Sequence, residues 1–184
     1  MGSRDLRRAI RGCSVLMLLT MPTGCEQAPP PDEVRPVATV REIMADMIGP
    51  SADVLWSALT TVSTADGYED RVPQSDEEWA RLRHSAVTMV ESANLLLTDG
   101  RHMAPEGSSA AAPGVELEPD SIAMLVSVNR GEWVGLVHQL QDSGEAFLRL
   151  VDARSSDAQP FFDVGDQLTT ACDDCHQVFW YPTD

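Results

Sequence analysis

The segment LTTACDDCHQVFWYP, near the end of the chain, places Cys172, Cys175 and His176 within five residues. In a helix these positions are i, i+3 and i+4, so all three side chains project from one face. Residues of these types can form a redox-active dithiol, supply part of a zinc site, or attach a haem through two thioethers with the histidine as iron ligand. The remainder of the chain has to discriminate among these three chemistries.

The other cysteines and histidines argue against the first two chemistries. A structural zinc site takes four ligands, but the chain has no second cysteine pair, and His84, His102 and His138 are scattered. A thioredoxin-like dithiol accompanies an α/β pattern, and no alternating strand pattern is visible. C-x-x-C-H is the signature of c-type haem attachment. We therefore expect one covalent haem c per chain, bonded to Cys172 and Cys175, with His176 as an iron ligand.

The first 24 residues have the organisation of an export signal. Four arginines precede the short apolar run CSVLMLLTM and the small-residue exit PTGC, which is the pattern of a secretory leader. Cys25 follows this exit, as the lipidated cysteine does in lipoprotein signals, although an ordinary leader cut nearby remains an alternative. We expect a signal peptide over 1–24, a proline-rich tether over 25–37 and one domain over 38–184. The expected location is periplasmic or otherwise extracytoplasmic, on a lipid anchor.

The charge of the chain bears on its partners. The formal net charge is −16, and the basic side chains are all arginines. Nucleic-acid binding needs a basic footprint, so we expect no nucleic-acid partner. An acidic surface steers association toward a basic patch on a partner protein, although solubility alone would also explain it.

Apolar residues recur at steps of three and four along most of the chain, which predicts amphipathic helices. Gly49-Pro50 predicts a kink or restart in the first helix, and Ser75 with Glu78 fits a capping box. Turn-rich loops are expected over 63–74 and 104–120. These patterns predict an all-α fold, an antiparallel four-helix bundle with haem c on the C-terminal helix. The four expected helices span 38–63, 75–100, 130–153 and 157–179.

A helical chain with C-x-x-C-H close to its end resembles the class II c-type cytochromes, cytochrome c′ and cytochrome c556. The resemblance covers about residues 38–181 and rests on VGDQLTTACDDCHQVFW and TVREIMADM. It departs at Phe179-Trp180, where the family often has tyrosine and arginine. The resemblance implies that Cys172 and Cys175 are the thioether anchors and His176 the proximal ligand. It also leaves a homodimer open, because related bundles often dimerise.

The sixth iron position separates two functions within this resemblance. In the cytochrome c556 type a methionine of the first helix binds iron, and the protein carries single electrons. In the cytochrome c′ type that position is apolar, and iron binds small gases such as NO or CO. Met44 and Met47 both lie on the predicted inward stripe, and Met44 is favoured by its spacing after Arg41, although core packing alone would explain either. We expect a one-electron carrier, not an enzyme, with a five-coordinate gas-binding module as the alternative.

Overall fold

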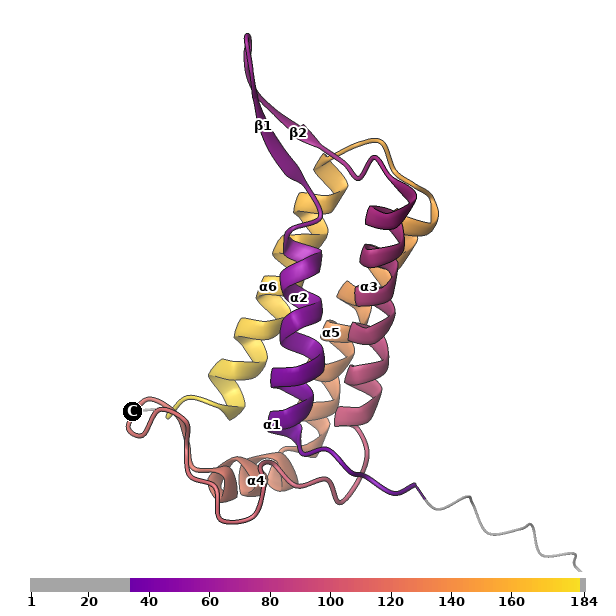
Figure 1. The fold of residues 1–184 in the computed structure, drawn as a ribbon. Helices are drawn as coiled ribbons and strands as arrows, with labels where there is room; N and C mark the ends of the chain where they lie inside the picture. The colour runs from indigo at the N-terminus through magenta and orange to yellow at the C-terminus, as the bar shows by residue number, and fades with distance from the viewer. Residues whose placement is uncertain (1–33, 183–184) are drawn as a thin grey trace, which may run out of the picture. The chain divides into compact units, whose positions relative to one another are not determined.

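The computed structural model describes residues 34–182, so the expected leader, Cys25 and most of the tether lie outside the described residues. From Arg35 onward the chain forms one unit built mainly of helices (Figure 1). Its elements are α1 (Val40–Ile43), the π-helix η1 (Met44–Ile48), α2 (Gly49–Trp56), β1 (Thr60–Thr64), β2 (Gly67–Arg71), α3 (Asp76–Leu96), α4 (Pro119–Val128), α5 (Arg130–Asp152) and α6 (Gln159–Phe179).

The first helical segment changes register at η1. Ile43 is 0% exposed and Ala52 is 2% exposed, so both face the core although they are nine positions apart. In an uninterrupted α-helix nine residues make about two and a half turns, and the two side chains would point to opposite sides. A π turn contains one more residue than an α-helical turn, because its hydrogen bond joins residues five positions apart instead of four. Here the Gly49 N–H donates to the Met44 carbonyl. The kink or restart expected at Gly49-Pro50 is this change of register, which ends at Gly49.

The longer helices pack side by side around one apolar core. α3 packs on α5, α5 packs on α6, and α2 packs on α3, whereas α2 and α6 touch only sparingly. The capping box at the start of α3 is confirmed, because the Glu78 N–H donates to Ser75 Oγ over 3.2 Å and the Ser75 N–H donates to Glu78 Oε2 over 2.9 Å. Buried aromatic rings join the ends of the helices: Trp133 meets Phe179 edge to face at 5.3 Å.

The expected all-α, four-helix bundle is wrong. The chain leaves the helical path after Trp56, and β1 and β2 form an antiparallel hairpin in which Thr60 pairs with Arg71 and Thr64 pairs with Gly67. The hairpin extends beyond the ends of the helices (Figure 1). β-branched side chains, dense in Thr60–Thr64, fit a strand better than a helix. Ala65 and Asp66 form the turn, and Gly67 directly after it has a φ of +130°, a backbone conformation that favours glycine.

A further helix, α4, also departs from the expected bundle. It covers the apolar stretch SIAMLVSV, which lies outside the four expected helices. Pro119 in its first turn suits a helix start, because proline has no N–H to leave unpaired there. Ile122 and Val126 are buried, so α4 closes one end of the core. Among the described residues, none of the helices combines the length and apolar character needed to cross a membrane.

Candidate functional site

The C-terminal half of α6 carries the cysteine–histidine motif. The helix buries Phe161, Val164, Leu168, Ala171 and Phe179 in the core. The two cysteines and the histidine lie beside this buried stripe and are half-buried. The amphipathic pattern of α6 therefore turns the motif toward the inside of the molecule rather than toward solvent.

A cavity of about 210 Å³ lies against the motif. It is bounded by η1 and α2 on one side and by α5 and α6 on the other, which explains why α2 and α6 make so few contacts. Most of its lining is apolar. The lining residues are Met44, Ile48, Gly49, Ala52, Asp53, Trp56, Leu96, Leu136, Val137, Leu140, Ala171, Cys172, Cys175 and His176.

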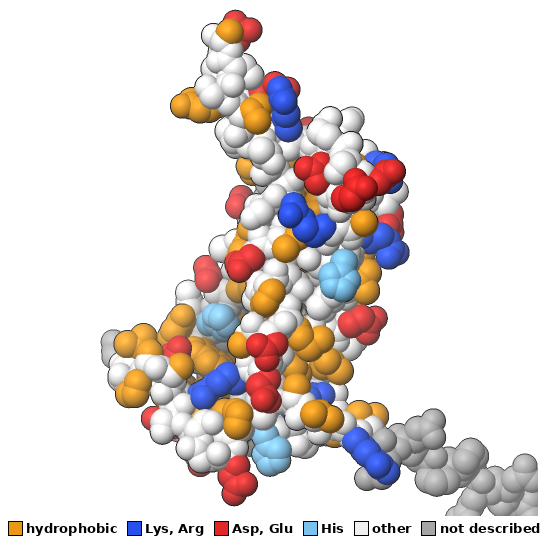
Figure 2. All heavy atoms as spheres, in the orientation of Figure 1, with side chains coloured by type: hydrophobic (Ala, Val, Ile, Leu, Met, Phe, Trp, Pro, Cys, Tyr) orange, Lys and Arg blue, Asp and Glu red, His pale blue; other side chains and the backbone are white. Residues whose placement is uncertain are grey.

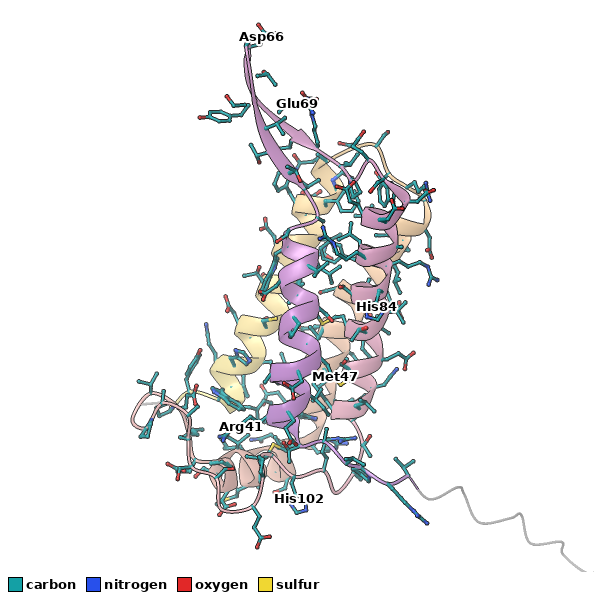
Figure 3. All side chains as sticks on the ribbon, viewed as in Figure 1. Arg41, Met47, Asp66, Glu69, His84 and His102 are labelled. Atoms are coloured by element: carbon teal, nitrogen blue, oxygen red, sulfur yellow. The ribbon has the colours of Figure 1, made fainter. Side chains whose placement is uncertain are left out.

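The structure brings four of the predicted site residues to this cavity: Met44, Cys172, Cys175 and His176. Met47 is half-buried but does not line it, and Figure 3 shows Met47 on the flank of the helix nearer to α3. The two methionines therefore occupy different environments, although the sequence pattern put both on one stripe.

The remaining histidines lie away from the cavity. His84, His102 and His138 are exposed, and Figure 3 shows His84 on α3 and His102 beyond the lower end of the helices. Within residues 34–182, no group of three or more histidine, cysteine, aspartate or glutamate side chains is placed to hold a metal ion. The site therefore does not have the ligand set of a structural zinc centre.

The thiols do not have the properties of a redox dithiol. Burial raises the pKa of Cys172, and the Asp173 carboxylate adds to the rise. Burial raises the pKa of Cys175 to about 12, with the neighbouring Cys172 as the second cause. Reactive dithiols instead have a lowered pKa and lie near a helix N-terminus, whereas this pair lies in the C-terminal half of α6.

The histidine is disposed to remain neutral. Burial lowers the pKa of His176, and the carboxylates of Asp173 and Glu116 partly oppose this effect. A neutral imidazole offers a free nitrogen lone pair, which is the form that ligates metals. His176 is thus chemically suited to act as an axial ligand at the wall of the cavity.

Sequence reasoning missed the loop that covers the end of α6. The Glu116 carboxylate accepts hydrogen bonds from the backbone N–H groups of Ala111 and Ala112 at 3.1 and 3.2 Å. It also pairs with the Trp180 side chain, and the Leu117 N–H donates to the Trp180 carbonyl over 2.9 Å. The two contacts with Trp180 join residues 64 and 63 positions apart, and no local pattern in the sequence signals them.

Sequence reasoning also missed Trp56, at the cavity, and Arg41, which lies on the same helical segment as Met44 but does not line the cavity. Trp56 is 46% exposed, lines the cavity and lies 3.9 Å from the position of a Cβ on Gly165 of α6. Arg41 donates from Nη2 to the Ser109 carbonyl over 2.9 Å. Its Nε is buried and has no hydrogen-bond partner among the described residues. The signal that could have found Arg41 is its position three residues before Met44.

No family model, curated protein or solved structure matches the chain. The chemistry of the site is therefore judged from its donors alone. Two thiols, an imidazole and a thioether surround an apolar cavity, and the thiols are free. This set fits a covalently attached haem, which needs two thiols for attachment, an axial nitrogen ligand and apolar walls.

Proposed function

We propose that the protein is an exported c-type cytochrome that carries one haem c and transfers single electrons. The observation that supports this most is the shared cavity, which is lined at once by Cys172, Cys175 and His176 of α6 and by Met44 of η1. When bound, the haem supplies an iron centre that alternates between the ferric and ferrous states. Everything else in the function depends on how the residues of this chain hold and surround it.

Each α6 residue of the motif has a separate role in this proposal. The Cys172 and Cys175 thiols form the two covalent attachments, and the half-buried helix face keeps them at the cavity wall. His176 ligates iron through a neutral nitrogen, consistent with its lowered pKa. Trp180 and Tyr181 flank the imidazole, with ring centroids 6.0 and 6.3 Å away. These rings limit the access of water to the ligand.

The thioether of Met44 is the proposed sixth ligand. It reaches the cavity from η1, whereas the imidazole reaches it from α6. A thioether ligand stabilises reduced iron and raises the reduction potential. The apolar side chains of α5, among them Leu136 and Leu140, keep the dielectric low around the iron. This combination suits an electron carrier better than a gas-binding protein.

Arg41 is proposed to bind an anionic group of the cofactor. A buried guanidinium nitrogen without a partner is costly, so a carboxylate that reaches it gains a charge-assisted hydrogen bond. Haem has two carboxylates, and Arg41 lies on the same short helical segment as Met44. We therefore assign Arg41 as the partner of one of them.

The partner is proposed to be a redox protein with a basic docking patch. α6, which forms one wall of the cavity, carries Asp163, Asp166, Asp173 and Asp174 and no arginine. Acidic side chains are also spread over the face drawn in Figure 2. Complementary charge mainly raises the rate of encounter. The proposed lipid anchor on Cys25 would keep this encounter at a membrane surface.

The test is maturation in a host that attaches haem c to exported proteins. The wild-type chain is expected to be coloured and to keep its pigment in acidified organic solvent. Replacing both cysteines with alanine should abolish covalent pigment, whereas Thr170→Ala, on the exposed side of the same helix, should not. A colourless wild-type protein, or pigment fully extracted by the solvent, would refute the proposed function.

A further inference from the structure

We propose that the π turn of η1, with Gly49 as its closing residue, is the device that aims Met44 into the cavity. This inference rests on the proposed function, because it concerns the sixth ligand of the haem. It adds a positioning residue, Gly49, that contacts the cavity but supplies no ligand atom. The observation that supports it is that the spacing of two cavity-lining residues, Met44 and Ala52, does not match the geometry of a continuous α-helix.

Met44 and Ala52 both line the cavity and are eight positions apart. In a continuous α-helix eight residues overshoot two turns by about 80°. Met44 would then lie about 80° to one side of Ala52, beyond Ile48, rather than in line with Ala52. Seven residues fall only about 20° short of two turns. The one extra residue held in the π turn gives Met44 the orientation of a residue seven positions before Ala52.

The hydrogen bond that closes the π turn joins Gly49 to Met44 itself. The Gly49 N–H donates to the Met44 carbonyl, and a Cβ placed on Gly49 would lie 3.1 Å from that carbonyl oxygen. That separation is tighter than ordinary van der Waals contact, so a side chain at this position presses on the bond. Pro50 follows and has no N–H with which to rebuild an α-helical bond. A side chain at position 49 therefore strains the turn.

The helical segment before the π turn, α1, is fixed at its N-terminal end. Thr39 and Glu42 form a capping box at the start of α1. The backbone N–H groups of Val40 and Arg41 donate to the carbonyls of His102 and Met103 at 2.9 and 3.0 Å. Because both ends of the segment are tied down, the register change is confined to η1, where it rotates Met44.

The test compares three variants of the haem-loaded protein. Gly49→Ala should lose more than half of the methionine-to-iron charge-transfer band of the oxidised protein and gain binding of carbon monoxide when reduced. Gly135→Ala is the matched control, because it is an exposed helical glycine whose added Cβ meets nothing within 4 Å. It should keep the band. Removal of the exposed Ala45 shortens the spacing from Met44 to Ala52 to seven, so it should also keep the band.

Each outcome of this test either supports or overturns the inference about η1. A full band in Gly49→Ala, or loss of the band when Ala45 is removed from a protein that still folds, would overturn the inference. If Gly49→Ala does not fold, the Ala45 deletion decides alone. A wild-type protein that holds covalent haem but has no methionine band also refutes the role of η1. A wild-type protein without covalent haem refutes the proposed function instead, so the two failures are distinguishable.

Discussion

The indole ring of Trp180 lies beside the imidazole of His176, with ring centroids 6.0 Å apart and planes inclined by 39°. The Trp180 N–H of the backbone also donates to the His176 carbonyl over 2.8 Å. On its other side, Trp180 is joined to the loop before α4 through Glu116 and Leu117. The Trp180 side chain thus connects the proposed proximal ligand, His176, to a distant loop. Replacing Trp180 therefore tests how much this loop contact contributes.

Replacing Trp180 should separate its two contributions. Trp180→Phe keeps a ring beside His176 but loses the hydrogen bond to Glu116, so the free energy of unfolding should fall by about 1 kcal/mol. Trp180→Ala also loses packing of a half-buried ring and should cost about twice as much. Urea unfolding measures both. Trp56→Phe is the control, and a larger loss there than in Trp180→Phe would contradict the role of the loop contact.

Acid should release the Glu116 contact. Its hydrogen bonds to Trp180 and to the Ala112 and Ala111 backbone, with Arg41 nearby, lower the pKa of Glu116 below its ordinary 4.5. Because the folded pKa is the lower one, the stabilisation is complete above pH 4.5 and disappears as the pH falls through the folded value. The wild-type protein should therefore exceed Glu116→Gln in stability at pH 7, and the difference should vanish in acid. A difference independent of pH would exclude this carboxylate as its source.

Met44 and Met47 should respond differently to the same replacement. Met44→Leu removes the proposed sixth ligand, so the reduced protein should bind carbon monoxide rapidly and the potential should fall. Met47→Leu alters only packing and should leave both properties unchanged, because Met47 does not line the cavity. Stopped-flow mixing with carbon monoxide and a redox titration measure the two effects. Rapid binding to the wild-type protein would instead favour the five-coordinate, gas-binding alternative.

Gly144 of α5 packs tightly against α3. A Cβ there would lie 2.8 Å from Val90 Cγ2 and 3.2 Å from Met89 Cγ. Gly144→Ala should therefore destabilise the fold by about 1–3 kcal/mol through overpacking. Gly135→Ala, on the exposed side of the same helix, should stabilise it by about 0.5–1 kcal/mol. Thermal and urea unfolding of the pair check the prediction, which fails if both replacements stabilise.

Much of the helical content could be predicted from the sequence. The periodic stripes located α3, α5 and α6 to within a few residues at most ends, and Ser75 with Glu78 marked the start of α3 correctly. The fold class was nevertheless wrong. The stretch from Thr60 to Arg71 alternates poorly and lacks an apolar face, so residues up to 63 were predicted to continue the first helix and residues 63–74 to form a loop. A hairpin without a buried face leaves little periodic signal.

By itself, the sequence determined that Cys172, Cys175 and His176 share a helix face, because spacing within one helix depends only on local geometry. It put Met44 and Met47 on one stripe and favoured Met44 only by its spacing after Arg41. The tertiary structure separated them, because Met44 lines the cavity and Met47 does not. It also joined Glu116 to Trp180 across a distance in sequence that no local pattern can encode. Such contacts exist only after the helices pack, since packing of the whole core selects the register and the loop position.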